Sequence, residues 1–173
     1  MQTTIQEVVE RGTEISFKVI CPNLQVLNRL RRIMMSAVST SAVNSVEIFE
    51  NGSELSDEQL SDRIQLVPVR GEPGDVFSLI VEGPAVVTSD SLKGATVSGI
   101  IICKLGPERR LNIRATVETG TGAQHAKWSP ISAFCYPSEL NNVTTFDCTV
   151  RTTGVLPATT LIERTLDALH ATS

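Results

Sequence analysis

The chain has 173 residues, a formal net charge of −4 and a sequence pI of about 5.2. Its 41% hydrophobic and 20% charged residues match ordinary globular domains, which excludes a largely disordered chain. A domain that binds nucleic acid by neutralising phosphates usually carries a basic surplus, which this sequence lacks. Aromatic residues make up only 4%, so the core must be built mainly from Val, Ile and Leu, as in a sheet-rich protein.

The four cysteines, Cys21, Cys103, Cys135 and Cys148, are far apart in the sequence. No Cys-x-x-Cys pair is present, so a zinc or iron–sulfur site has no spacing signal. The amino-terminal segment 1–11 is polar and acidic, unlike a signal peptide, and no apolar run reaches the length of a membrane span. We therefore expect four reduced thiols in an intracellular protein, with no disulfide framework and no bound metal.

The first predicted elements are two strands and a helix. Residues Thr4–Val9 and Glu14–Ile20 read as strands, and the turn pair Arg11-Gly12 between them predicts a hairpin. A helix follows from Asn23, its expected cap, to about Val38.

The apolar residues of this helix cover more than half of its circumference at about 100° per residue. A helix that covers only its own sheet needs a stripe nearer about 100° wide, so the excess predicts a second buried contact, with a partner subunit as its simplest source. Arg31 falls inside the arc, where a charge must be paired or must extend to solvent, so we expect a fixed acceptor for it. The arc consists of Leu24, Val26, Leu27, Leu30, Ile33, Met34, Met35, Ala37 and Val38.

The rest of the chain is predicted to be strand-rich, with two more helices. A strand over Val43–Phe49 precedes a short helix that begins at a capping box, Ser56 to Gln59, and ends near Ile64. A final helix starts at Pro157. The remaining strands are expected at Val76–Glu82, Val86–Ser89, Gly99–Lys104, Leu111–Glu118, Ile131–Tyr136 and Val143–Arg151. The apolar face of the final helix is formed by Ala158, Leu161, Ile162, Thr165, Leu166, Ala168 and Leu169.

Candidate catalytic groups are sparse. His170 lies in the last turn of the final helix, where a positive charge interacts favourably with the helix dipole. His125 lies in a loop, with no nucleophile or orienting carboxylate near it in sequence. Gly120-Thr121-Gly122 lacks the further residues of a dinucleotide or phosphate loop and is interpreted as a turn. No Asp-x-Asp or Asp-x-x-x-Asp cluster could hold two magnesium ions for nucleotidyl transfer. We therefore predict no catalytic residues and no cofactor.

Five segments, in order from about residue 5 to 170, carry a resemblance to a known family. Asn28-Arg29-Leu30-Arg31-Arg32, followed by Val46-Glu47-Ile48, resembles the N-x-L-R-R helix and strand of alpha-type subunits of DNA-directed RNA polymerase. Residues 57–68 resemble the D-E-x-L-A-H-R-x-G-L-I-P segment of the archaeal and eukaryotic branch, and residues 125–130 are identical to its H-A-K-W-S-P motif. Val81-Glu82-Gly83-Pro84 and Thr153-Gly154-Val155-Leu156-Pro157 also match that branch.

The resemblance implies an α+β fold with a discontinuous dimerisation domain, a sheet plus two amphipathic helices, at residues 1–45 plus 142–173. A mostly β domain at residues 46–141 is inserted between the two parts. The expected partner is a small L-type subunit, and the heterodimer is the platform on which the two large catalytic subunits and the small polymerase subunits assemble. The chain itself is implied to be a non-catalytic part of a nucleotidyltransferase complex, without direct sequence-specific DNA contact and without a membrane.

The resemblance also implies which residues make these contacts. Because Arg31 lies on the apolar arc of the first helix and Arg32 on its polar face, Arg31 is expected to meet acceptors within the dimerisation domain or its partner, and Arg32 to reach outward to a large subunit. From their apolar faces, the first and final helices together are expected to expose a large apolar surface in the isolated chain. The residues expected to bind the partner are Leu27, Leu30, Arg31, Arg32, Met34, Val38, Leu161, Leu166 and Leu169. Those expected to dock onto other subunits are Arg63, His125, Lys127 and Trp128.

The sequence departs from the family pattern at a few positions. Asp62 and Gln65 stand where the family has His and Gly, and Ser39 replaces the usual Pro after the first helix. Many relatives carry a cysteine-rich segment that holds iron–sulfur or zinc, whereas the connection Gly83–Lys93 contains no cysteine. The chain therefore resembles a compact version without metal.

Two alternative functions are considered beside that of an assembly subunit. One is a free-standing interaction or regulatory module that captures a polymerase subunit, and the other is a small hydrolase that uses His125. Co-purification with both large polymerase subunits distinguishes a core subunit from the first alternative. The expected location is the cytoplasm for an archaeal chain or a viral factory, and the nucleus for a eukaryotic one.

Overall fold

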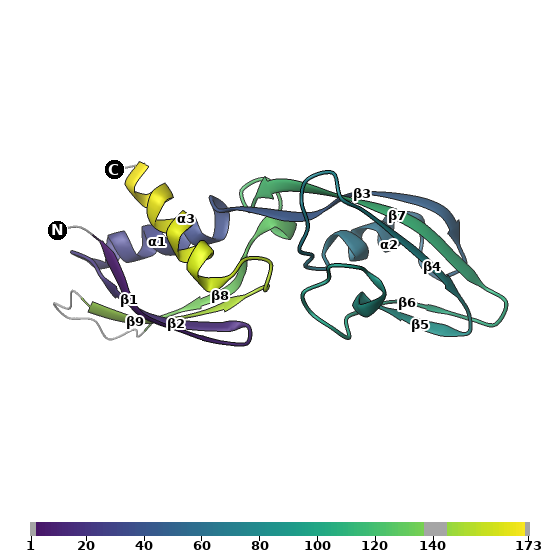
Figure 1. Ribbon diagram of the computed structural model, residues 1–173, viewed down its shortest axis with the longest axis horizontal. Helices are drawn as coiled ribbons and strands as arrows, with labels where there is room; N and C mark the ends of the chain where they lie inside the picture. Colours follow the sequence, from purple (N-terminus) through teal and green to yellow (C-terminus); the bar gives the residue numbers. More distant parts are fainter. Residues whose placement is uncertain (1–2, 137–144, 172–173) are drawn as a thin grey trace. The chain divides into compact units, whose positions relative to one another are not determined.

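The computed structural model describes residues 3–136 and 145–171. The chain divides into two compact units, which are considered separately (Figure 1). The first unit comprises Met1–Ser39 and Thr121–Ser173, and the second comprises Thr40–Gly120. Both contain antiparallel sheets and at least one helix, which confirms the predicted α+β class.

The first unit is built on a four-stranded antiparallel sheet in the order β1-β2-β9-β8. Its strands are β1 (Thr4–Arg11), β2 (Glu14–Ile20), β8 (Ile131–Cys135) and β9 (Thr145–Thr152). The β1–β2 hairpin is confirmed. Ile15 pairs with Val150, Phe17 with Cys148 and Val19 with Phe146, and all six side chains are buried. Because side chains alternate between faces, this register places one face of the sheet in the core.

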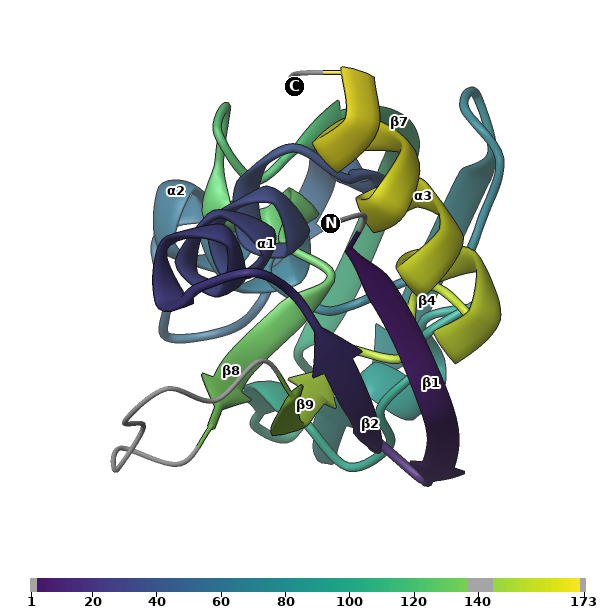
Figure 2. The same ribbon diagram turned by 90° about the vertical axis from the view of Figure 1, so that its left-hand side faces the viewer.

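Two helices pack on that face (Figure 2). Helix α1 (Leu24–Ser36) is capped by Asn23, whose Oδ1 accepts a hydrogen bond from the Val26 amide at 3.1 Å, as predicted. Helix α3 (Ala158–Ala171) follows β9 and carries the apolar face expected from its sequence. Leu27, Leu30 and Met34 of α1, together with Leu161, Ile162 and Leu169 of α3, complete the core with the strands.

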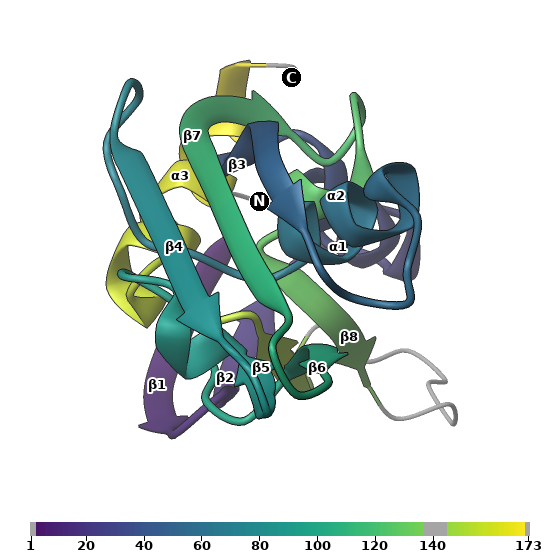
Figure 3. The same cartoon turned by 90° about the vertical axis from the view of Figure 1, so that its right-hand side faces the viewer.

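The second unit contains a three-stranded sheet, a two-stranded sheet and one α-helix (Figure 3). Strands β3 (Ser39–Asn51), β7 (Arg110–Thr121) and β4 (Val76–Glu82) form the larger sheet, in the order β3-β7-β4. Strands β5 (Ala85–Thr88) and β6 (Ile101–Leu105) form the smaller one, and a 3-10 turn, η1 (Ser89–Ser91), follows β5.

Helix α2 (Asp57–Gln65) of the second unit begins as predicted. Ser56 Oγ accepts from the Gln59 amide at 3.3 Å, and Gln59 Oε1 accepts from the Ser56 amide at 3.2 Å, which completes the capping box. Leu60 and Ile64 then enter a separate core made with the strands of this unit.

The bounds of several elements differ from the sequence-based expectation. The strand expected over Val86–Ser89 ends at Thr88, because Ser89 begins the 3-10 turn. A second 3-10 turn, η2 (Ala126–Trp128), was not predicted. The predicted insert spans residues 46–141, whereas the second unit spans Thr40–Gly120, and β8 belongs to the first unit's sheet through its pairing with β9. Residues 143 and 144 of the last predicted strand lie outside the described residues.

Three of the four cysteines are buried free thiols, Cys21, Cys103 and Cys148, and Cys135 is exposed at the end of β8. Loss of solvation on burial raises the pKa of the Cys21 and Cys103 thiols and raises that of Cys148 to about 12. Within the described residues, no helix combines the length and the apolar character that crossing a membrane requires.

We predict that iodoacetamide at about pH 8 alkylates Cys135 rapidly in the folded chain and modifies the other three cysteines only on unfolding. The thiolate is the reactive form, and burial both hides the other sulfurs and disfavours their ionisation. Peptide mass mapping over time measures each rate. Cys135→Ser should remove the fast phase and nothing else, and similar rates at all four sites would contradict the buried positions.

Candidate functional site

Most of the apolar residues expected to bind a partner lie in the first unit's own core. Leu27, Leu30 and Met34 of α1 are each 0% exposed, and Val38 beyond its end is also buried. In α3, Leu161 and Leu169 are buried and Leu166 is half-buried. The buried ones therefore hold the two helices on the sheet, and the free chain does not present them to a partner.

The apolar residues of α1 that are not buried against the sheet form a narrow strip along one side of the helix. Leu24 is 41% exposed and Met35 is 37% exposed, whereas α3 has no exposed large apolar side chain among its described residues. Arg31 is half-buried, seven residues after Leu24 and four before Met35, so all three lie within about 40° of one another around the helix. We call Leu24, Arg31 and Met35 the α1 flank. The exposed apolar surface is thus smaller than the sequence suggests.

Arg31 has a weak acceptor within the described chain. Its Nη1 lies 3.6 Å from the Met35 Sδ atom, one turn along the helix. A thioether is a poor hydrogen-bond acceptor, and among the described residues Arg31 forms no ion pair. The expected fixed acceptor is therefore not supplied by the described part of this chain.

The polar face of α1 lies opposite the core and borders a hollow of about 570 Å³. Arg32 is exposed on this face, and its carbonyl accepts a hydrogen bond from Ser36 Oγ at 2.7 Å. Asn28, the first residue of the N-x-L-R-R pattern, accepts from the Tyr136 hydroxyl at 3.2 Å and so ties the helix to the end of β8. The described residues that line the hollow are Gln25, Asn28, Arg29, Arg32, Ile33 and Ser36.

The H-A-K-W-S-P segment forms the loop and short turn that follow β7. His125 caps the turn η2, because its Nδ1 accepts a hydrogen bond from the Lys127 amide at 3.1 Å. The Lys127 ammonium lies 4.5 Å from the centroid of the Trp128 ring, which is cation–π distance. Thr153 fixes the end of the segment, where its amide and hydroxyl both donate to the Pro130 carbonyl at 3.0 and 3.1 Å. His125 therefore has a structural part in this loop.

The loop and helix α1 touch. The Ala123 amide donates to the Ser36 carbonyl at 3.0 Å, at the carboxyl end of α1. Gly122 lies so close that a Cβ atom added there would be 2.1 Å from the Met35 carbonyl oxygen. Two segments separated by about ninety residues thus form one surface of the first unit, and only glycine fits at the contact.

The remaining residue expected to dock onto other subunits, Arg63, belongs to the second unit. It lies in the last turn of α2 and donates from Nη2 to the Ile101 carbonyl at 3.0 Å. His170 lies in the last turn of α3, as expected. Within residues 3–136 and 145–171, no three His, Cys, Asp or Glu side chains are grouped as a metal site requires.

We predict that Gly122→Ala destabilises the first unit and changes the loop. Overpacking against a backbone oxygen typically costs about 1–3 kcal/mol, or several degrees in Tm for a chain of this size. Trp128, the single tryptophan, lies in the same loop, so its emission maximum should shift with the substitution. Gly106→Ala is the matched control, since its added Cβ meets nothing closer than Arg109 Cγ at 3.8 Å. Equal, unperturbed behaviour of the two variants would disprove the close contact.

Comparison with known proteins identifies relatives over most of the chain. The chain is 35% identical over 167 residues to DNA-directed RNA polymerase subunit Rpo3 of Methanocaldococcus jannaschii, covering 91% of this chain and 85% of that protein. It is 35% identical to the subunit of the same name from Pyrococcus horikoshii and 33% identical to that from Thermococcus kodakarensis, over 69% and 78% of this chain. The aligned region spans only 54% and 58% of those two longer proteins. No family model matches the chain. At this level of identity and coverage, the chain belongs to the family of archaeal RNA polymerase subunit Rpo3.

Proposed function

We propose that the chain is a non-catalytic assembly subunit of a multisubunit DNA-directed RNA polymerase, which pairs with a small L-type subunit through its first unit. The observation that carries the proposal is the α1 flank. Leu24 and Met35 expose apolar side chains on a helix whose other apolar residues are buried or half-buried in the core. Exposed apolar side chains on a rigid helix form a surface that a partner protein can bury on binding.

The rigidity of α1 supports this role. Leu27, Leu30 and Met34 fix the helix on the sheet, and Asn23 fixes its first turn. A surface that is held in place before binding loses little conformational entropy when the partner arrives. Arg31 then lies where a carboxylate or carbonyl of the L-type subunit can supply the stronger acceptor that this chain lacks among its described residues.

The large catalytic subunits are assigned to a different face in this proposal. Arg32 and the hollow beside it lie on the polar side of α1, and the loop with Lys127 and Trp128 contacts the end of the same helix. Tryptophan and arginine are enriched among the residues that dominate binding energy at interfaces. One helix can therefore take part in two successive contacts, first with the L-type partner and then with a large subunit.

The catalytic chemistry is assigned to other chains of the complex. His125 caps a 3-10 turn and His170 lies in the last turn of α3, and among the described residues no cluster of metal ligands accompanies them. As a member of an archaeal polymerase family, the chain is proposed to act inside the cell.

We predict that Leu24→Gln and Met35→Gln each weaken the complex with the cognate L-type subunit about threefold or more. Full burial of such a side chain is worth about 1.5–3 kcal/mol, and binding can bury only the part still exposed, 41% for Leu24 and 37% for Met35; about 1.4 kcal/mol corresponds to a factor of ten. The free energy of unfolding should change by no more than about 0.5 kcal/mol, because both side chains are exposed. Isothermal titration calorimetry and urea unfolding measure the two quantities.

Leu30→Ala is the contrasting variant, because Leu30 is fully buried and its loss should cost about 2–5 kcal/mol of stability. If the two glutamine variants bind the L-type subunit as well as the unmodified chain, the flank is not the contact.

We predict that Arg31→Ala and Arg32→Ala fail at different stages of assembly. Arg31→Ala should weaken the heterodimer by about 1–3 kcal/mol, because its acceptors are left unpaired in a desolvated setting, whereas Arg32→Ala should leave the heterodimer intact and impair recruitment of the large subunits. Native gels of reconstituted mixtures resolve both stages. Failure at the same stage would remove the division between the two faces.

Capture of the L-type subunit alone from cells, without either large subunit, would favour the alternative of a free-standing regulatory module. Mass spectrometry of proteins bound to the tagged chain distinguishes these outcomes.

A further inference from the structure

Strand β4 lies at one edge of the larger sheet in the second unit (Figure 3). It pairs with β7 along its whole length without a register shift. Among the described residues, its backbone forms no hydrogen bond on the side away from β7. Its side chains Val76 and Ile80 are 53% and 58% exposed. An edge strand with free backbone groups is a template to which a further strand can add.

The other edge strands of the described sheets carry features that hinder strand addition. The pairing of β1 with β2 contains a register shift, and β5 and β8 are only four and five residues long, with shifts of their own. Strand β6 is bridged to Ser53, and β3 exposes Glu47 and Glu50. Bulges, short strands and charged side chains are usual protections of a sheet edge. Strand β4 has none of them from Val76 to Val81.

The sequence of β4 is complementary to itself in an antiparallel arrangement. With Ser78 of two copies opposite each other, Val76 of each copy lies opposite Ile80 of the other. On the other face of the sheet, Phe77 then lies opposite Leu79. Both pairs are apolar, and apolar cross-strand pairs stabilise a sheet. The single charged residue of β4 is its last, so the two copies place these charges at opposite ends of the contact.

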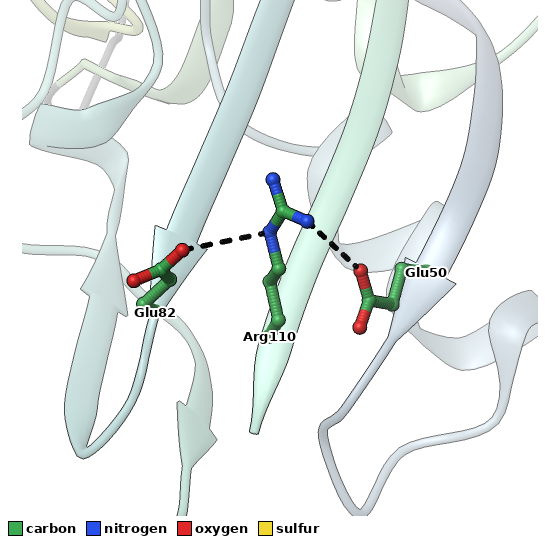
Figure 4. Close-up of polar contacts among 3 residues, drawn as sticks. All are labelled: Glu50, Glu82 and Arg110. Carbon is green, nitrogen blue, oxygen red and sulfur yellow. Dashed lines mark ion pairs between the residues drawn. The ribbon is translucent and has the colours of Figure 1, made fainter. Parts of the chain in front are cut away.

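The outer face of the same sheet is less suited to a second copy than its edge. Arg110 of β7 lies between Glu50 of β3 and Glu82 of β4, at 3.7 and 3.8 Å (Figure 4). Arg114 lies 3.7 Å from Glu47, so the group contains three glutamates and two arginines. Two such faces in contact would oppose net negative charges and remove water from the ion pairs. The charges therefore favour contact through the edge of β4.

We propose that the free chain forms a symmetric dimer in which β4 pairs antiparallel with β4 of a second copy, with Ser78 at the centre. The larger sheets of the two copies then form one continuous sheet. Such a contact uses the same surface on both copies and closes as a dimer. Each copy covers an apolar edge of the other that would otherwise favour aggregation. The proposal concerns the second unit and goes beyond the contacts proposed for α1.

Sedimentation velocity of the full chain over a range of concentrations tests the dimer. We expect a monomer of 18.7 kDa at low concentration and a dimer at high concentration. Ile80→Lys should raise the dimer dissociation constant about tenfold or more, because the interface contains this residue twice and lysine on an edge strand opposes pairing. Leu66→Lys is the matched control, since Leu66 is 50% exposed at the end of α2, and it should leave the constant unchanged. The melting temperature of each variant shows that it folds.

Three further measurements identify the contact. Position 80 lies opposite position 76 in the proposed register, so Val76→Glu combined with Ile80→Lys should restore the dimer through pairs of opposite charge. Hydrogen exchange of β4 amides should slow as the protein concentration rises, because edge amides become bonded to the second copy. Phe49→Ser should leave the dimer intact, because Phe49, 59% exposed beside Arg114, belongs to the outer face and takes no part in edge pairing.

A chain that stays monomeric at every concentration would overturn the proposal, as would equal weakening by Ile80→Lys and Leu66→Lys. Loss of the dimer in Phe49→Ser would show packing through the outer face instead, and its loss in Leu24→Gln or Met35→Gln would place the contact on α1. A double variant that folds but does not restore the dimer would reject the register. Binding of the L-type subunit is a separate measurement, so the two proposals succeed or fail separately.

Discussion

The pairing of β2 with β9 is the constraint on which the first unit depends. It joins residues 14–20 to residues 145–151 in an uninterrupted antiparallel register. Closing so long a connection costs conformational entropy, which the buried faces of both strands and the two helices must offset. Helix α1 follows β2 and helix α3 follows β9, so the same pairing brings the two helices to one face of the sheet.

Once that register is set, helix α1 has three sectors with different surroundings. Leu27, Leu30 and Met34 are sealed against the sheet, Leu24 and Met35 remain partly exposed on one flank, and Arg32 lies on the polar side. The residues that stabilise the unit are thus different from those proposed to bind a partner on the same helix. This separation lets a binding surface change without unfolding the unit that presents it, which suits a protein whose proposed role is to hold other subunits.

Local signals in the sequence were sufficient for the helix caps, the hairpin and most strand positions. The capping hydrogen bonds of Asn23, Ser56 and Gln59 join residues only three positions apart, so the local sequence is enough to predict them. Which sector of α1 faces the sheet was not predictable. The apolar arc is wider than half the helix, and the sector within it that faces the sheet depends on long-range packing against the strands and α3.

The same limit applies to the candidate site. The close approach of Gly122 to Met35 joins distant segments, and periodicity carries no information about it. The role of His125 as a cap depends on a turn of three residues, which is too short for a periodic signal.

The two parts of the first unit are joined by a long intervening segment, and the β2–β9 pairing tolerates changes in its length. The second unit lies between α1 and β8 in sequence, and it has its own core. Loop-closure entropy grows only logarithmically with length, so doubling the intervening segment costs the β2–β9 pairing roughly 0.6 kcal/mol. That is small beside the about 1.5–3 kcal/mol from one fully buried large apolar side chain such as Phe146. Changes in the length of the intervening segment are therefore compatible with an unchanged sheet and helix pair.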